Sequence, residues 1–233
     1  TVSDITAQEC RQFLGRPVDV VTPNGFEPSF TPATDEEYDV KREAARKKLL
    51  DVAAAMCGEE VPENAVLVGI GGRYEWKNKG IDVFIDALDK LNRTEFEGKC
   101  VHAFIMIPSG HNGPDKQLIS KLAGNPSGYV TRTSHYLMNP EYDAVMSRLN
   151  ALNLNNALGD KVKVYFIPSY LNGNDGVFNK SYYELLVGVD VTAFPSYYEP
   201  WGYTPLESIA CSVPTITSNL SGFGIWASKL ADK

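Results

Sequence analysis

Two loops of this sequence contain side chains whose types and spacing fit recognition of a charged ligand. The first, "GGRYEWKNKG" (71–80), places Arg73 and Lys79 in one turn between an expected strand and an expected helix. Two cations beside the amino end of a helix form a site suited to a phosphate or pyrophosphate. A solvated turn whose two cations face water fits the same pattern, so the residues alone leave both interpretations open.

The second loop, "FPSYYEPWGYTPLES" (194–208), combines five aromatic residues with three prolines and two glutamates. Thr204, Pro205 and Glu207 match a helix start, with threonine at the N-cap, proline in the first turn and glutamate at the third position. Glu207 can therefore cap this helix or bind a ligand, and both roles stay open. The aromatic rings, Trp201 among them, offer faces for stacking on a base or sugar ring, or belong to the core.

Short apolar runs alternate with helical patterns along the chain. The expected strands are residues 18–21, 65–70, 101–107, 162–167, 189–194 and 213–217. The expected helices are residues 34–58, 80–92, 139–152, 180–188 and 204–212. Because several strands are nearly continuous in apolar residues, as in sheets covered on both faces, the alternation predicts a doubly wound, Rossmann-like α/β fold with a parallel sheet.

Ligands of open parallel sheets bind outside the carboxyl ends of the strands. The two loops described above follow the expected strands 65–70 and 189–194, so we expect both at the ligand-binding edge. Residues 108–137, rich in Gly, Pro, Ser and Asn, are predicted to form a long irregular excursion over the surface.

Composition argues against several classes of partner. The 233 residues carry a formal net charge of −7 without a basic stripe, so neither nucleic acid nor an anionic membrane is an expected partner. No apolar run approaches about 20 residues, so no membrane span is expected. Four scattered cysteines without a C-x-x-C pair are typical of free thiols in a reducing compartment, here the cytoplasm. The three histidines form no ligand cluster and no D-x-D motif occurs, so neither a metal nor another cofactor is expected.

Four segments resemble the glycogen synthase family of animals and fungi, the type that uses UDP-glucose. They are "VTPNG" (21–25), "GRYEWKNKG" (72–80), "FPSYYEPWGYTPLES" (194–208) and "SNLSGFG" (218–224). The resemblance covers most of the chain and implies the second domain of a two-domain glycosyltransferase (GT-B) fold. Residues 1–233 would then be a single nucleotide-sugar-binding domain, a fragment without the first domain and the final C-terminal segment.

The resemblance implies a role for each site residue. Arg73 and Lys79 would hold the pyrophosphate of the donor and stabilise the charge that grows on the leaving UDP, without a metal. Glu199 would lie against the glucose. The residues expected to bind the donor are Tyr182, stacked on the uracil, then Trp201, Gly202, Tyr203 and Thr204, and Glu207 at the ribose hydroxyls.

The reaction implied is transfer of glucose, with retained configuration, from UDP-glucose to the non-reducing end of glycogen or another α-1,4-glucan. The implied partners are this donor, the glucan and the missing N-terminal domain of the same protein, and oligomer formation is left open. Without that domain, we expect the chain to bind the donor weakly and to catalyse little.

Other functions remain compatible with the residues. One is a retaining GT-B transferase that uses ADP-glucose or makes a disaccharide, and another is a non-catalytic nucleotide-sugar-binding module. A carbohydrate-binding module that uses the aromatic residues is a third. An NAD enzyme is disfavoured because Tyr74 replaces the last glycine of the G-x-G-x-x-G fingerprint, and no P-loop occurs.

Overall fold

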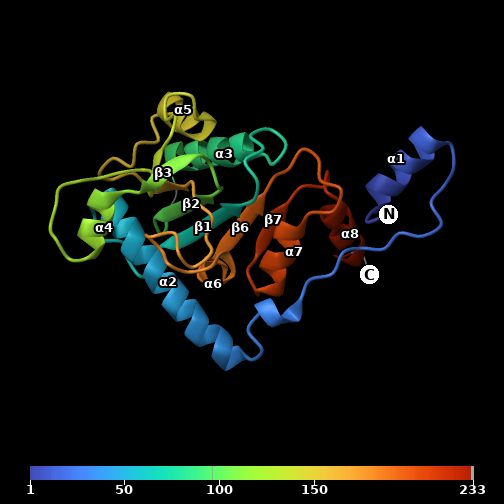
Figure 1. Cartoon of the computed structure of the whole chain (residues 1–233), viewed down its shortest axis with the longest axis horizontal. Coiled ribbons are helices and arrows are strands. Elements are labelled where there is room, and N and C mark those ends of the chain that lie inside the picture. The colour runs from blue at the N-terminus through green and yellow to red at the C-terminus, as the bar shows by residue number, and fades with distance from the viewer. Residues whose placement is uncertain (96, 232–233) are drawn as a thin grey trace.

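A central parallel sheet organises the protein in the computed structural model, which describes residues 1–95 and 97–231 (Figure 1). Its strands lie in the order β5-β2-β1-β6-β7. Their bounds are β1 Val66–Gly71, β2 Val101–Met106, β5 Val162–Ile167, β6 Val191–Phe194 and β7 Thr215–Thr217. The chain order along this sheet is therefore 3-2-1-4-5, the doubly wound order, in which the direction of winding reverses between β1 and β6. The predicted fold class is confirmed.

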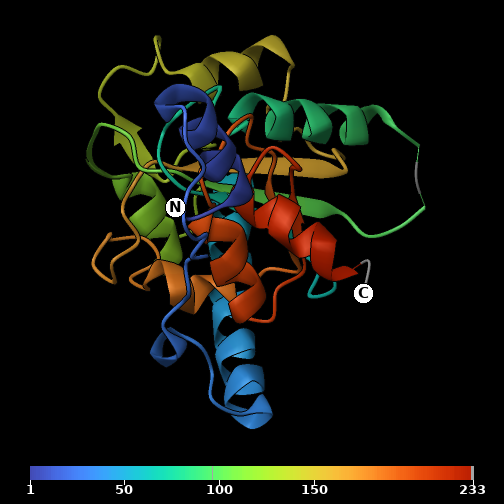
Figure 2. The same cartoon turned by 90° about the vertical axis from the view of Figure 1, so that its right-hand side faces the viewer.

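Helices cover both faces of the sheet. Figures 1 and 2 show α3 (Ile81–Arg93) and α5 (Ala144–Ala151) on one face, and α2 (Asp35–Cys57) and α6 (Tyr182–Leu186) on the other. Alternate strand residues supply two separate cores, because successive side chains of a strand point to opposite faces. Phe104 and Tyr165 pack with α2, whereas Ile105 and Phe166 pack with α3 and α5.

The two ends of the longest helix, α2, match its sequence signals. The Thr34 hydroxyl accepts a hydrogen bond from the Glu37 amide at the N-cap. Gly58 closes the helix in the left-handed conformation, with φ 77°, and its amide donates to the Ala54 carbonyl. No helix among the described residues is both long and apolar enough to cross a lipid bilayer.

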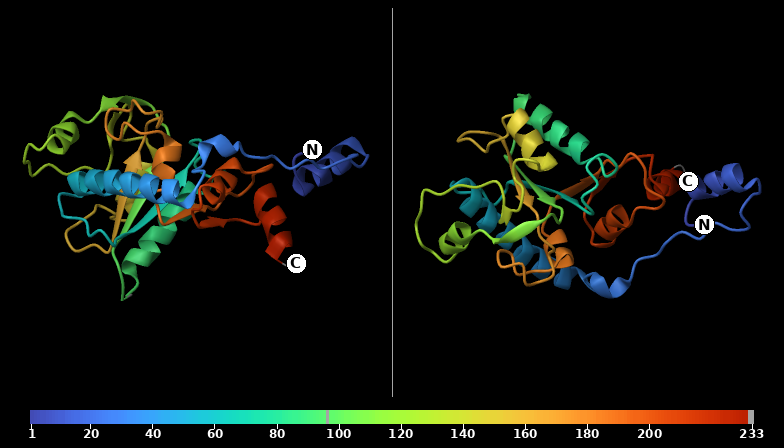
Figure 3. Two further views of the ribbon diagram at one scale, coloured as in Figure 1. Left: turned by 90° about the horizontal axis from the view of Figure 1, so that it is seen from below. Right: turned by 45° about the horizontal axis from the view of Figure 1, so that its top comes forward.

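The first helix, α1 (Asp4–Leu14), lies apart from the sheet. Figure 3 shows it at one end of the molecule, beside α8 (Gly222–Ala231), with a long connection leading back to the 3-10 helix Pro28–Phe30. α1 has no buried residue, and an ion pair of 2.5 Å between Asp4 and Lys229 joins it to α8. The prediction that residues 1–233 form one domain stays a prediction.

Two segments differ in type from their secondary-structure predictions. Residues 18–21 form no strand. The Thr1 amino group donates to the Val20 carbonyl at 3.1 Å, but no strand among the described residues forms a ladder with this segment. The excursion at 108–137 is partly regular, since it contains the antiparallel pair β3 (His111–Pro114) and β4 (His135–Leu137) and the helix α4 (Lys116–Leu122).

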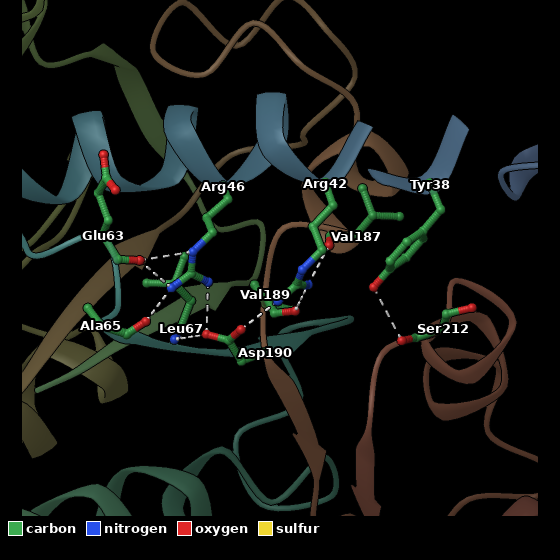
Figure 4. A network of polar contacts seen from close by, with 10 residues as sticks. All are labelled: Tyr38, Arg42, Arg46, Glu63, Ala65, Leu67, Val187, Val189, Asp190 and Ser212. Atoms are coloured by element: carbon green, nitrogen blue, oxygen red, sulfur yellow. Dashed lines mark hydrogen bonds and ion pairs between the residues drawn. The ribbon is translucent and has the colours of Figure 1, made fainter. Parts of the chain in front are cut away.

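The amino end of β6 is tied to α2 by a network of ion pairs and hydrogen bonds (Figure 4). Arg42 and Arg46 contact the Asp190 carboxylate at 2.6 Å and 2.9 Å, and the Leu67 amide donates to the same carboxylate at 2.8 Å. Arg42 also donates to the Val187 and Val189 carbonyls, both at 2.9 Å. Burial acts to raise the pKa of Asp190, but the Leu67 amide and the two arginines together lower it.

We expect Asp190→Asn to lower the free energy of unfolding at neutral pH by about 2 kcal/mol, because it leaves two half-buried guanidinium groups without their counter-ion. The lowered pKa of Asp190 means that its contribution is present above the unfolded pKa, about 3.9, and is lost as the pH falls through the folded pKa. Urea unfolding of both proteins at neutral and acidic pH measures this difference.

Asp51→Asn is the matched control, because Asp51 pairs with Lys47 on the exposed side of the same helix. This change should cost less than about 1 kcal/mol. Equal effects of the two substitutions on the free energy of unfolding would contradict the role given to Asp190. So would a difference between Asp190→Asn and the native protein that stays the same at acidic pH.

The carboxyl end of β1 packs directly under a tyrosine of α6. A Cβ atom at Gly71 would lie 2.8 Å from both Cε2 and Oη of Tyr182, so only glycine leaves room for this ring. The Tyr182 hydroxyl is buried and has no hydrogen-bond partner among the described residues. Gly71 therefore fixes where the Tyr182 ring lies relative to the sheet.

Gly71→Ala is predicted to destabilise the protein by about 1–3 kcal/mol, since the ring or the strand must shift. Gly69→Ala, in the same strand, should cost less because its nearest neighbour is the flexible end of Met106, at 3.1 Å. Urea unfolding in a double-mutant cycle tests the cause. In a protein that already carries Tyr182→Ala, Gly71→Ala should lower the free energy of unfolding much less. An equal decrease in both backgrounds would show that the Tyr182 ring is not responsible.

Candidate functional site

The loops after β1 and β6 meet where the strand order reverses. The Tyr197 amide donates to the Asn78 carbonyl at 2.9 Å, which ties one loop to the other. Gly80, at the N-cap of α3 with φ 65°, lies so close to the Pro195 carbonyl that a Cβ atom would be 2.0 Å from its oxygen. The two loops that the sequence singled out therefore form one continuous surface at the ligand-binding edge of the sheet.

An ion pair also joins these loops. Lys79 Nζ lies 2.5 Å from Glu199 Oε2, and only 13% and 15% of the two side chains are exposed. The two residues predicted to lie against the pyrophosphate and the glucose are thus each other's partner in this structure. Glu199 is close to Gly202 as well, because a Cβ atom at Gly202 would lie 3.3 Å from Glu199 Cγ.

A pocket of about 520 Å³ opens beside this surface. Its walls come from the carboxyl ends of β1, β2 and β5 and from the starts of α6 and α7 (Tyr203–Ala210). Of the predicted site residues, the pocket brings together Arg73, Tyr182, Thr204 and Glu207. It thus has a cation and a helix start, which suit a phosphate, an aromatic ring, which suits a planar base, and a carboxylate, which can accept hydrogen bonds from hydroxyl groups.

Arg73 lies at the open side of the pocket. Its side chain is 78% exposed and its guanidinium lies 2.9 Å from the Glu75 carboxylate. An exposed ion pair of this kind is weak. Arg73 can therefore exchange Glu75 for a ligand anion at low cost.

Glu207 is half-buried in the pocket wall and does not cap a helix. Its Oε1 accepts a hydrogen bond of 3.0 Å from the Tyr183 hydroxyl. Burial raises the pKa of Glu207, and the Tyr183 hydrogen bond acts in the opposite direction. Tyr183 is itself fixed by Phe30, whose ring stacks on it with centroids 5.0 Å apart.

The start of α7 differs from its prediction. Gly202, with φ 104°, is the N-cap and makes no side-chain cap, so the predicted N-cap Thr204 is wrong by two positions. The sequence signal was misleading because the helix starts at a glycine, Gly202, through its backbone conformation. Thr204 and Glu207 then lie inside the helix, where neither side chain acts as a cap. The first amides of α7, those of Tyr203 and Thr204, are thus left for another acceptor.

Trp201 lies outside the pocket. It is 4% exposed, and its ring packs edge-on against Phe223 at 5.8 Å and tilted against Trp226 at 5.9 Å. This aromatic cluster anchors the loop to α8. The structure therefore gives Trp201 a packing position, one of the two roles that the sequence left open, whereas Gly202 and Tyr203 lie at the adjoining helix start.

Several pocket residues escaped the sequence analysis. Ser169, Tyr170 and Leu171 follow β5 and line the pocket, and Tyr183 orients Glu207. The position of the first three, directly after a predicted strand at the same edge of the sheet, was a usable signal. Nothing in the local pattern separates Tyr183 from its neighbour Tyr182.

Comparison with known proteins identifies the family. The family model described as glycogen synthase matches residues 1–123 and 125–233. Glycogen [starch] synthase isoform 2 of Saccharomyces cerevisiae is 30% identical over all of this chain, and the liver enzyme of Mus musculus is 27% identical over 96% of it. The chain spans 42% and 40% of those two proteins.

Solved structures show the same fold at low identity. HepE of Anabaena, in complex with UDP and glucose, superimposes with a TM-score of 0.54 at 16% identity, over 99% of this chain and 45% of that one. Sucrose-phosphate synthase of Thermosynechococcus elongatus gives 0.52 at 19% identity, over 97% and 41%. The fold that these structures share with this chain is the GT-B fold. Because the family model matches almost every residue, and the sheet and its helices agree with this fold, the chain belongs to the glycogen synthase family.

Proposed function

We propose that this chain is the donor-binding half of a retaining glucosyltransferase that moves glucose from UDP-glucose to the non-reducing end of an α-1,4-glucan. The observation that carries the proposal is the pocket at the point of strand reversal, where Arg73, Tyr182, Thr204 and Glu207 converge. The membership of the chain in the glycogen synthase family supports it. So does the likeness of its fold to HepE, which was solved with UDP and glucose.

The diphosphate is proposed to lie between the loop after β1 and the start of α7. Arg73 and the amides of Tyr203 and Thr204 would contact its oxygens, and Lys79 would exchange its Glu199 partner for a phosphate. The negative charge that grows on UDP as the glucosyl bond breaks would then meet two cations and a helix amino end. Glu199, released from Lys79, would face the glucose.

The nucleoside is proposed to occupy the side of the pocket formed by α6 and α7. The Tyr182 ring, which lines the pocket, would stack on the uracil. The Glu207 carboxylate would accept hydrogen bonds from the ribose hydroxyls while the Tyr183 hydroxyl holds its other side. The donor thus needs no metal for any contact proposed here.

The remaining parts of the enzyme are proposed to lie outside this chain, which spans 42% of its yeast relative. A second domain would supply further catalytic groups and part of the acceptor surface. The chain alone would then bind the donor weakly and turn it over slowly. Synthesis from a nucleotide sugar also agrees with the cytoplasmic location expected from the scattered cysteines.

Calorimetric titration with UDP tests the donor site. We expect Arg73→Ala and Lys79→Ala each to weaken binding about tenfold or more, because each removes a charge-assisted hydrogen bond to the diphosphate. Arg16→Ala is the control, since Arg16 is similarly exposed, at 73%, and pairs with Asp19, which is 93% exposed. Unchanged affinity in both site variants would refute the diphosphate position, and tighter binding of ADP than of UDP would favour the ADP-glucose alternative.

The pH dependence of UDP-glucose binding tests Glu207. Burial raises the pKa of Glu207 and the Tyr183 hydroxyl lowers it, so Tyr183→Phe should raise this pKa further. If the ionised carboxylate binds the ribose, affinity falls as the pH drops through this pKa, and in Tyr183→Phe the fall begins at a higher pH. Titrations between about pH 5 and pH 8 measure this shift.

Tyr198→Phe is the matched control, because the Tyr198 hydroxyl donates to Glu9 on the surface instead. It should leave the pH profile unchanged. Identical profiles for the native protein and Tyr183→Phe would argue against a ribose contact at Glu207.

A further inference from the structure

A second hollow, of about 420 Å³, lies next to the candidate donor pocket, and the proposed donor contacts use none of it. Tyr74 lines both spaces, so they adjoin at this side chain. The other walls come from Trp76 in the loop after β1, from Ser109 and Gly110 after β2, and from the segment between β4 and α5. Both spaces therefore open at the carboxyl edge of the sheet.

The inner wall of this hollow is rigid and aromatic. The Tyr74 hydroxyl accepts a hydrogen bond of 3.1 Å from the Val145 amide, and its ring meets Phe166 edge-on, with centroids 6.1 Å apart. Trp76 is half-buried against the core on the α3 face. The Met138 amide donates to the Gly110 carbonyl at 3.0 Å, which holds the two outer segments together.

The outer rim presents large side chains to solvent. Tyr142 is 83% exposed and Met138 is 57% exposed, although the segment that carries them is well ordered by backbone hydrogen bonds. Tyr142 falls within the expected helix 139–152, but α5 begins only at Ala144, so the Tyr142 ring lies on the loop before the helix, at the rim. Exposed aromatic rings with one polar edge are suited to a ligand that is partly apolar and partly hydroxylated.

Charge narrows the class of ligand. The residues described as lining the hollow include no lysine or arginine, so a phosphate or nucleotide would find no counter-ion there. The carboxylate in the wall, Asp143, is occupied as the N-cap of α5, where it accepts from the Met146 amide at 2.9 Å. The remaining polar groups, such as Ser109 and Asn139, are neutral. A neutral polyhydroxylated chain fits these walls.

We propose that this hollow binds a stretch of the α-1,4-glucan acceptor several glucose units away from the reacting end. This inference rests on the proposed function, because a chain whose end reaches the donor pocket must continue across a neighbouring surface. Tyr142 and Trp76 are assigned to stack on pyranose rings, with Tyr74 as the partition between glucan and donor. The hollow holds the acceptor in place through successive additions of glucose.

Calorimetric titration of the 233-residue chain with maltoheptaose, and separately with UDP, tests the inference. Tyr142→Ala should weaken maltoheptaose binding about three- to tenfold and leave UDP binding unchanged, whereas Tyr142→Phe, which keeps the ring, should bind both ligands like the native protein. Met138→Ala gives a second, smaller loss at the same rim. Phe13→Ala is the control, because Phe13 is 78% exposed on α1, at the far end of the molecule.

The outcomes separate the two proposals. Maltoheptaose binding that is unaffected by Tyr142→Ala, or equally affected by Phe13→Ala, overturns the glucan assignment. If UDP binds and maltoheptaose does not, the glucan assignment of the hollow is overturned and the proposed donor site is still supported. If maltoheptaose binds in a way that depends on Tyr142 and UDP does not bind, the glucan assignment of the hollow is supported and the proposed donor site is refuted. Equal binding of a β-1,4-linked glucose oligomer also overturns the assignment to an α-glucan.

Discussion

Contact between the loops that follow β1 and β6 determines the geometry of the whole ligand-binding edge. Gly80 touches the Pro195 carbonyl, the Tyr197 amide bonds to Asn78, and Lys79 pairs with Glu199. These three contacts are a close steric approach, a backbone hydrogen bond and a largely buried ion pair. All of them cross the point where the strand order of the sheet reverses. The start of α7 and the loop after β1 are thereby fixed relative to each other before any ligand arrives, which is the preorganisation that electrostatic catalysis needs.

The sequence was most informative where burial decides the structure. Apolar runs located every strand of the central sheet, and several of these runs are nearly continuous because a strand covered on both faces contains few polar residues. Residues 18–21 have the same local character but form no strand, since pairing depends on a neighbour that local pattern does not reveal. The pair β3 and β4 was missed for the opposite reason: its strands are short and polar, and Gly113 and Pro114 lie within β3.

For the candidate site, the sequence predicted which kinds of side chain take part, but not which side chains pair with each other. The cations, the glutamates and Thr204 were recognisable from two unusual loops, and Tyr182 from the family resemblance. Arg73, Tyr182, Thr204 and Glu207 meet in one pocket. The pairing of Lys79 with Glu199 joins residues 120 positions apart, and the hydrogen bond from Tyr183 to Glu207 spans 24. Such contacts depend on how α6 and α7 pack, which no periodicity encodes. Trp201 shows the same limit, because only the positions of Phe223 and Trp226 decide that its ring is buried.

The Lys79–Glu199 pair has a consequence for selectivity among anions. An ammonium that already has a carboxylate at 2.5 Å offers little attraction to a free phosphate or sulfate, because such an ion must first displace that carboxylate and leave it unneutralised. A sugar nucleotide can replace both partners of the pair at once, because its phosphate oxygens can accept hydrogen bonds from Lys79 and its sugar hydroxyls can donate to Glu199. The Lys79–Glu199 pair is thus electrically self-satisfied, and under the proposed function a molecule that carries a diphosphate and a hexose together separates the pair at a lower cost than a diphosphate alone.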